Sequence, residues 1–274
     1  MNAGALRLTR LAERVWLLAV RLPSPPPLAD LAAERPLALF LDFDGTLVDI
    51  ADTPDGIAVP ADLLRKLLEL RDRMDDRLAI VTGRALEDLE KYLGRPEIAR
   101  AGGHGAERID AAGEAVGAAS DPLPDDVRTA LRAFASLHDL TCEDKGGAVA
   151  VHYRNRRDIR DELLMLAQSL AERRDVRLSH GKCVIELTAA GADKGTAVTA
   201  FLQRPPFIGA QPIFVGDDVT DEDGFAAASA AGGFGVNVGE RVSRGARYGL
   251  DSPDAVHHWL GLEIGRASCR ERVS

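Results

Sequence analysis

Two carboxylates stand two residues apart in the segment DFDGT, residues 42–46. They directly follow an apolar run, residues 37–41, that is typical of a strand buried on both faces of a sheet. Side chains alternate along an extended chain, so Asp42 and Asp44 face one site, where two like charges are costly unless a cation or a shared proton neutralises them. Magnesium suits such a pair because it prefers oxygen ligands. Asp-Gly is also a common turn pair, so this motif alone leaves a structural role open.

Further polar residues follow other apolar runs or open a predicted helix. They are Thr82, Lys194, Asp217, Asp218 and Asp221. Thr82 offers a hydroxyl and backbone amides at a helix start, where anions bind favourably. Each residue has an ordinary alternative: a helix cap for Thr82, a solvated surface charge for Lys194, and a surface acidic run for the three aspartates. Together they predict a site for a cation and a phosphate, with one nucleophile.

The segments that carry these residues alternate between short apolar runs and helical periodicity. The apolar runs are 37–41, 78–81 and 212–215, and the helical stretches are 61–73, 86–93 and one from about 194. This order predicts an α/β fold with a doubly wound parallel sheet. In such sheets, ligands bind beyond the carboxyl ends of the strands, which is where the polar residues lie.

The middle of the chain has a different pattern, which predicts an α+β cap domain inserted into the sheet domain. We expect strands at 148–153 and 176–178 and helices at 125–137 and 159–172. The predicted organisation is an N-terminal extension at 1–35, a core at 36–108 and 187–262, a cap at 109–186, and a non-native tail at 265–274.

Composition limits the classes of partner. The 274 residues carry a net charge of −9, which argues against a general nucleic-acid binder. The apolar stretch within residues 11–22 is too short to span a bilayer and is better explained as an amphipathic helix than as a signal peptide. Three cysteines without metal-ligand spacing fit reduced thiols. We therefore expect a cytoplasmic monomer with a small-molecule substrate and no nucleic-acid or membrane partner.

The residues above form four motifs along the chain, which are 42–46, Thr82, Lys194 and 216–221. Their order resembles that of the haloacid dehalogenase superfamily of phosphotransferases. The resemblance implies a Rossmann-like core, Mg²⁺ and a phospho-aspartyl intermediate. Asp42 would attack phosphorus, and Asp44 would protonate the leaving oxygen and then activate water. Thr82 and Lys194 would hold the phosphoryl oxygens. The expected metal site comprises Asp42, Asp44, Asp217, Asp218 and Asp221, with Asp217 as a direct ligand and the last two as outer partners.

Longer strings, spread over about residues 36–260, resemble the trehalose-phosphate phosphatase family. They are 41–47, 79–84, 102–107, 151–155, 181–187, 191–195 and 216–222. The resemblance implies hydrolysis of trehalose 6-phosphate. The implied substrate-binding residues are Asp42, Phe43, Asp44, Gly83, Arg84, Glu107, Arg154, Lys182 and Glu186. His104 and His152 are as readily explained as structural histidines.

Three alternative functions stay open at this point. The same chemistry could act on another sugar phosphate, such as sucrose phosphate or a glycosyl phosphoglycerate. The chain could also be a sugar phosphomutase or a non-catalytic sugar-phosphate sensor. We further expect the cap to close over the substrate about hinges near residues 104–109 and 186–191.

Overall fold

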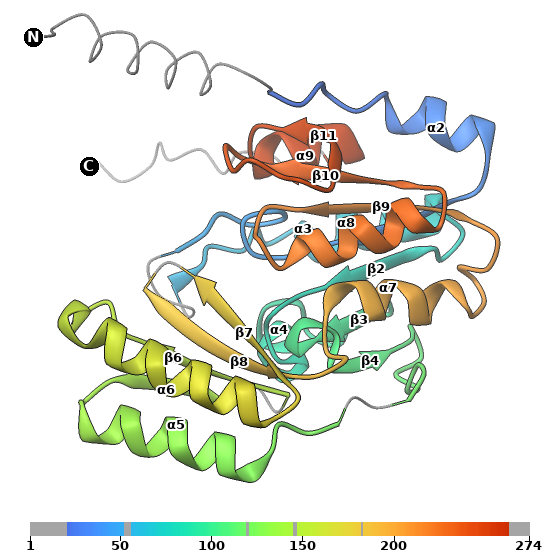
Figure 1. The fold of residues 1–274 in the computed structure, drawn as a ribbon. Helices are drawn as coiled ribbons and strands as arrows, with labels where there is room; N and C mark the ends of the chain where they lie inside the picture. The colour runs from blue at the N-terminus through green and yellow to red at the C-terminus, as the bar shows by residue number, and fades with distance from the viewer. Residues whose placement is uncertain (1–20, 52–55, 119–120, 145–146, 182, 263–274) are drawn as a thin grey trace, which may run out of the picture.

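The computed structural model describes residues 21–51, 56–118, 121–144, 147–181 and 183–262. Within them the chain forms two sheets, a large one of seven strands and a small one of four (Figure 1). The predicted tail, Lys182 and all but the last two residues of the predicted helix at 11–22 lie outside the described residues.

The large sheet has the strand order β11-β10-β9-β1-β2-β3-β4. Its strands are β1 (Leu37–Leu41), β2 (Leu78–Val81), β3 (Ala99–Gly102), β4 (Glu107–Ile109), β9 (Gln211–Gly216), β10 (Phe234–Val238) and β11 (Ala246–Leu250). All neighbouring pairs are parallel except β3 with β4. The chain leaves β1 toward β2 on one side and returns through β9 on the other. The order therefore reverses between β1 and β9, which is where ligands bind in such sheets.

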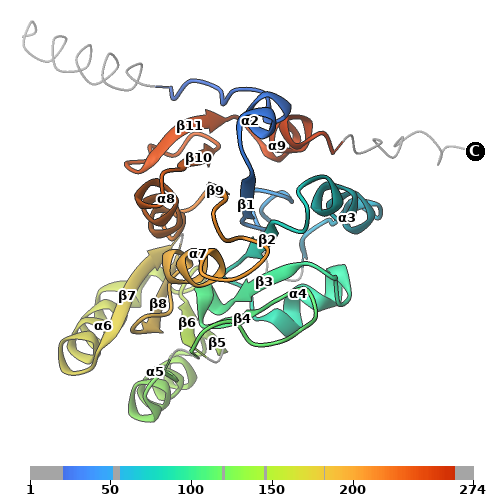
Figure 2. The same ribbon diagram turned by 90° about the vertical axis from the view of Figure 1, so that its right-hand side faces the viewer.

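Helices cover both faces of the large sheet (Figure 2). They are α2 (Leu28–Glu34), α3 (Leu63–Arg73), α4 (Leu86–Leu93) and α9 (Pro253–Leu260) on one face, and α7 (Lys194–Leu202) and α8 (Asp221–Ala230) on the other. Strand β1 shows why both faces are apolar. Leu37, Leu39 and Leu41 pack in the first core, whereas Ala38 and Phe40 pack in the second. The predicted α/β fold with a doubly wound sheet is confirmed.

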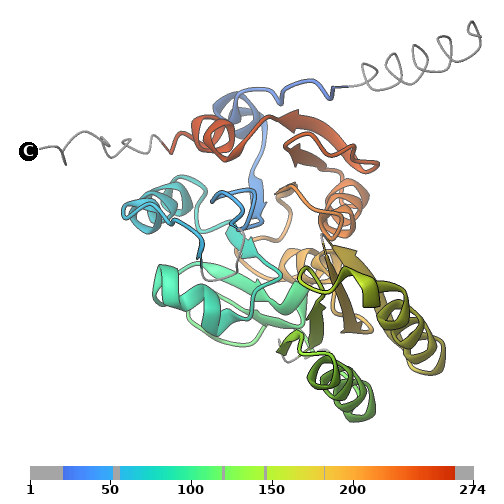
Figure 3. The ribbon, with the colours of Figure 1, turned by 90° about the vertical axis from the view of Figure 1, so that its left-hand side faces the viewer.

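The small sheet has the antiparallel order β5-β6-β8-β7. Its strands are β5 (Thr141–Asp144), β6 (Ala148–His152), β7 (Val176–Gly181) and β8 (Val184–Ala189), and its helices are α5 (Asp125–Leu137) and α6 (Arg160–Arg173), the latter preceded by the 3₁₀ turn η3 (Arg157–Ile159). We call these elements the inserted unit. Its helices cover the face of the small sheet that points away from the large sheet (Figures 1 and 3). The chain enters it after β4 and passes from β8 almost directly into α7.

The residues that precede β1 pack on the large sheet's edge. Leu28 is buried, and Trp259 Nε1 donates a hydrogen bond to the Pro26 carbonyl oxygen at 2.8 Å. Gly249 N–H bonds the Pro23 carbonyl oxygen at 3.0 Å. Residues 23–31 therefore pack against the folded core. No helix among the described residues is both long enough and apolar enough to cross a membrane.

Candidate active site

The ends of β1 and β9 bring Asp42 and Asp217 to the same edge of the sheet. The two strands pair in parallel with Leu41 opposite Val215, and Asp42 N–H bonds the Val215 carbonyl oxygen at 2.9 Å. Apolar side chains on both faces hold these strands in the middle of the sheet. The acids therefore lie where the strand order reverses, at the ends of two central strands.

Lys194 reaches this edge from the start of α7. Asp193 caps the helix by accepting a hydrogen bond from Thr196 N at 2.7 Å, so Lys194 is the first helical residue. Its Nζ lies 2.8 Å from Asp42 Oδ1 and 2.6 Å from Asp221 Oδ1. Only 2% of the lysine side chain is exposed. Burial alone would lower the pKa of Lys194, but the two carboxylates outweigh it and raise that pKa.

Asp42, Asp217 and Asp221 place carboxylate oxygens within 4.8 Å of one another. Burial raises the pKa of Asp42 well above its usual range against the opposing effect of Lys194, and the other two carboxylates raise it further. Burial, followed by the charge of Asp221, raises the pKa of Asp217 to about 7. Two buried acids and one half-buried acid beside one lysine thus form a site in which additional positive charge would be strongly stabilising.

The donor set of this cluster fits a magnesium ion. Asp217 Oδ1 is buried and has no hydrogen-bond partner among the described residues. Asp221 is committed elsewhere, because Oδ1 accepts from Lys194 and Oδ2 accepts from Asp218 N–H at 2.8 Å. Asp42 and Asp217 are therefore the side chains best placed to hold the ion, with Asp221 behind them. Asp218 is exposed, and the carboxylate of Asp44 is directed to an arginine.

Two glycines let the backbone approach these acids. Gly45 has a left-handed φ of +77°, and a Cβ there would lie 2.3 Å from Asp217 Cγ. A Cβ on Gly216 would lie 2.2 Å from Asp221 Cγ. Any larger residue at either position would displace a carboxylate of the cluster.

Arg84 holds Asp44 in a two-pronged ion pair. Its Nε and Nη2 donate to the two oxygens of Asp44, both at 2.6 Å, and its guanidinium also lies over the Tyr92 ring. Arg84 N–H donates to Thr82 Oγ1 at 3.1 Å, and Thr82 is fully buried at the end of β2. The ends of β1 and β2 are therefore linked through one arginine.

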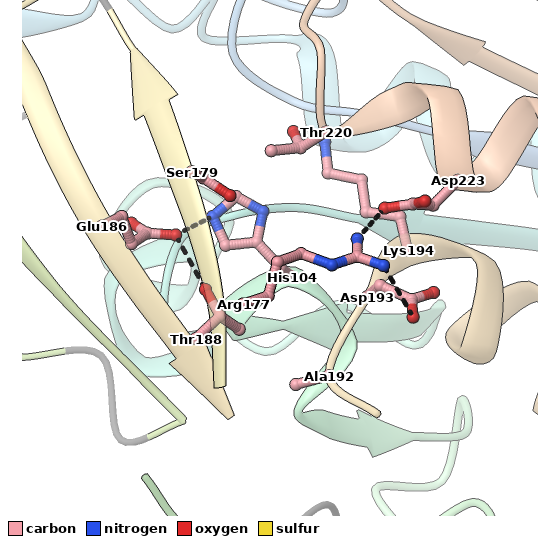
Figure 4. A pocket seen from close by; sticks show the side chains of 10 residues that line it. All are labelled: His104, Arg177, Ser179, Glu186, Thr188, Ala192, Asp193, Lys194, Thr220 and Asp223. Carbon is pink, nitrogen blue, oxygen red and sulfur yellow. Dashed lines mark hydrogen bonds and ion pairs between the residues drawn. The ribbon is translucent and has the colours of Figure 1, made fainter. Parts of the chain in front are cut away.

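A pocket lies between the large sheet and the inserted unit (Figure 4). Its lining residues are His104, Arg177, Ser179, Glu186, Thr188, Ala192, Asp193, Lys194, Thr220 and Asp223. The period of the strand explains the contribution of β8. Ile185 and Leu187 pack under α5 and α6, which turns the intervening Glu186 and Thr188 toward the large sheet. Lys194 thus lies at a pocket that polar residues of the inserted unit cover.

Known proteins match most of the chain. The family model described as trehalose-phosphatase matches residues 40–250. The chain belongs to the trehalose-phosphatase family.

Several relatives illustrate the match. A protein of Sinorhizobium fredii, named as a probable trehalose-phosphate phosphatase, is 43% identical over 208 residues, which cover 75% of this chain and 78% of that protein. The trehalose-6-phosphate phosphatase of Escherichia coli is 37% identical over 230 residues, covering 83% and 85%. The solved C-terminal domain of Candida albicans trehalose-6-phosphate phosphatase superposes with a TM-score of 0.74 at 24% identity, covering 89% of this chain and 98% of that one.

The remaining residues predicted to bind substrate occupy varied positions in this member of the trehalose-phosphatase family. Phe43 is fully buried in the core, and Gly83 follows Thr82. Glu107 begins β4, and desolvation followed by the charges of nearby glutamates raises its pKa. Arg154 is exposed in the turn after β6, and the described residues that line the pocket include neither Arg154 nor Glu107. His152 lies 3.4 Å from Glu143 within the small sheet.

Sequence reasoning missed two arginines that hold this site together. Arg241 donates to the Asp217 carbonyl oxygen at 2.9 Å, to Glu222 at 2.7 Å and to Asn237 Oδ1 at 3.1 Å. Arg177 of β7 forms ion pairs with Asp223 of α8 and, at 3.9 Å, with Asp193. Arg241 lies in no predicted element, and the strand predicted at 176–178 contains Arg177 but does not indicate its partners. Only the folded chain therefore reveals these contacts.

Proposed function

We propose that this chain hydrolyses trehalose 6-phosphate to trehalose and phosphate through a phospho-aspartyl intermediate on Asp42. The observation that carries the proposal is the buried contact of Asp42 with Lys194 beside Asp217 and Asp221, at the point where the strand order reverses. The names of the relatives support the choice of substrate.

The first chemical step follows from this arrangement. A carboxylate oxygen of Asp42 forms a bond to phosphorus while the bond from phosphorus to the sugar oxygen breaks. Lys194 is in position to neutralise a phosphoryl oxygen, and Thr82 offers a hydroxyl from the neighbouring strand end. Magnesium held by Asp42 and Asp217 would supply the remaining counter-charge to the phosphoryl group.

Asp44 is proposed to move the protons of both steps. Its carboxyl proton passes to the leaving sugar oxygen, and the resulting carboxylate then takes a proton from the water that attacks the phospho-aspartate. Both oxygens of Asp44 accept hydrogen bonds from Arg84, at 2.6 Å each. Proton transfer to the sugar oxygen therefore requires Asp44 to leave this pair, because neither oxygen is otherwise available to the substrate.

The inserted unit is proposed to act as the cap that selects the sugar. Glu186 lines the pocket and presents a buried carboxylate that can accept hydrogen bonds from sugar hydroxyls. The proposed sugar contacts also include Glu107, Arg154 and Lys182. A polar site of this kind rejects sugars that leave its groups unpaired.

A phosphate-release panel tests the proposal. Trehalose 6-phosphate, sucrose 6-phosphate, glucosyl-3-phosphoglycerate and glucose 6-phosphate are compared with Mg²⁺ and with EDTA. We expect Mg²⁺-dependent release with a clear preference for trehalose 6-phosphate. A preference for another compound overturns the substrate assignment, and isomerised sugar phosphate in place of free phosphate indicates a mutase.

The variant Asp42→Asn should be folded and inactive, and unchanged activity would exclude Asp42 as the nucleophile.

A further inference from the structure

His104 lies between two ends of the pocket. The phosphate end is the one at Lys194, and the sugar end is the one at Glu186. The N–H of His104 donates to the Thr82 carbonyl oxygen at 3.0 Å, which fixes the backbone of the 3₁₀ turn η2 (Gly103–Gly105) to the end of β2. Its side chain crosses to the inserted unit, where Nε2 lies 2.9 Å from Glu186 Oε1 (Figure 4). A single residue therefore contacts the end of a core strand and the polar face of β8.

The backbone around His104 is built for this crossing. His104 has left-handed φ and ψ angles of 56° and 26°, a region that residues with a side chain adopt at some cost. Its ring also occupies the space that a side chain at Gly83 would fill, because a Cβ there would lie 2.5 Å from His104 Cε1. The His104 ring thus reaches Glu186 only with an unfavourable backbone conformation at His104 and with glycine at position 83.

The hydrogen bonds of the His104 ring indicate which of its nitrogens carries the proton. Nδ1 is buried and has no hydrogen-bond partner among the described residues. A ring that carries its proton on Nε2 donates to Glu186 and leaves no buried N–H unpaired, so this tautomer suits the site. Thr188 Oγ1 donates to the same Glu186 oxygen at 3.3 Å. The carboxylate, 10% exposed, is thus oriented by two donors on its Oε1.

From these contacts we infer that His104 is a positioning residue for sugar selectivity. It sets the orientation of Glu186, and through Thr82 it fixes the position of that carboxylate relative to the phosphate end of the pocket. The inference rests on the proposed function, since it assumes that Glu186 contacts the sugar. It assigns His104 no part in phosphoryl transfer itself.

The test separates sugar recognition from chemistry by using two substrates. The variant His104→Asn tolerates the left-handed backbone but is too short to reach Glu186. We expect KM for trehalose 6-phosphate to rise about 10-fold to 100-fold, the range for loss of a hydrogen bond to a charged group. The kcat/KM for p-nitrophenyl phosphate, which has no sugar hydroxyls, should stay within about 3-fold. His104→Gln, which places an amide near the Nε2 position, should restore much of the sugar selectivity.

Two further variants guard against a purely structural effect. Thr188→Val removes the second donor to the same oxygen and should raise KM for trehalose 6-phosphate by about 3-fold. The double variant His104→Asn with Glu186→Gln should raise KM for trehalose 6-phosphate by less than the product of the increases in the two single variants. Equal losses on both substrates, unchanged KM, or additive losses would each overturn the inference. A wild-type protein that does not hydrolyse trehalose 6-phosphate would instead refute the proposed function.

Discussion

Lys194→Met is the most informative single change at the site, because it removes a charge and keeps a side chain of similar length. The lysine is buried, and its Nζ contacts Asp42 and Asp221 at 2.8 and 2.6 Å. Removing one partner of a buried ion pair costs about 3–5 kcal/mol of stability, because the remaining charges are left uncompensated. Loss of one preorganised donor to the transferring group lowers kcat by about 10²–10³-fold. We therefore expect a folded but weakened protein with little phosphatase activity.

The assay for Lys194→Met combines urea unfolding in EDTA with phosphate release in saturating Mg²⁺. The matched control is Lys66→Met on α3, since Lys66 is also buried and pairs with Asp62 at 2.9 Å, but 36% of the Asp62 side chain is exposed. The control should lose little stability and keep its kcat. If Lys194→Met unfolds at the same urea concentration as the wild type and its kcat falls less than about 10-fold, the electrostatic account of the site is wrong.

Three further changes test other parts of the structure. Arg241→Ala frees the carbonyl of Asp217, so Mg²⁺ affinity measured by calorimetry without substrate should fall about 10-fold; an unchanged affinity would show that this contact does not position the ligand. Burial lowers the pKa of His257 below 6.5, so its neutral form stabilises the fold above that pH, and the stability is lost as pH falls through the lowered value. His257→Gln should therefore show a shallower fall in urea stability from pH 7 to about 5, and identical slopes would contradict this. Arg177→Ala removes an ion pair between β7 and α8, so X-ray scattering without ligand should show a more extended particle; a profile identical to that of the wild type would show that the pair does not hold the inserted unit.

Much of the fold was readable from short apolar runs. Residues 37–41 and 78–81 were predicted as strands and form β1 and β2 with the same bounds. Helix α5 also begins and ends as predicted, and α6 is shifted by one residue. These elements are bounded by clear changes of polarity, so the local pattern and the tertiary structure agree.

The partners within the site were less predictable. Asp221 was expected behind the metal site, and its acidic run gave no sign of the buried contact with Lys194. Likewise, the motif around Arg84 did not reveal that its guanidinium pairs with Asp44. Such contacts join residues far apart in the chain, and their geometry depends on side-chain directions that neither composition nor period encodes.

Two points of the chain on either side of the inserted unit nearly touch. A methyl group on Gly105, just before β4, would lie 2.3 Å from the carbonyl oxygen of Asp193, where the chain returns to α7. The intervening segment, which comprises β4 and the inserted unit, therefore leaves and rejoins the rest of the core at almost one point. Insertions or deletions in that segment, or its complete replacement, can therefore change which substrates bind. The acids at the ends of β1 and β9 keep their positions.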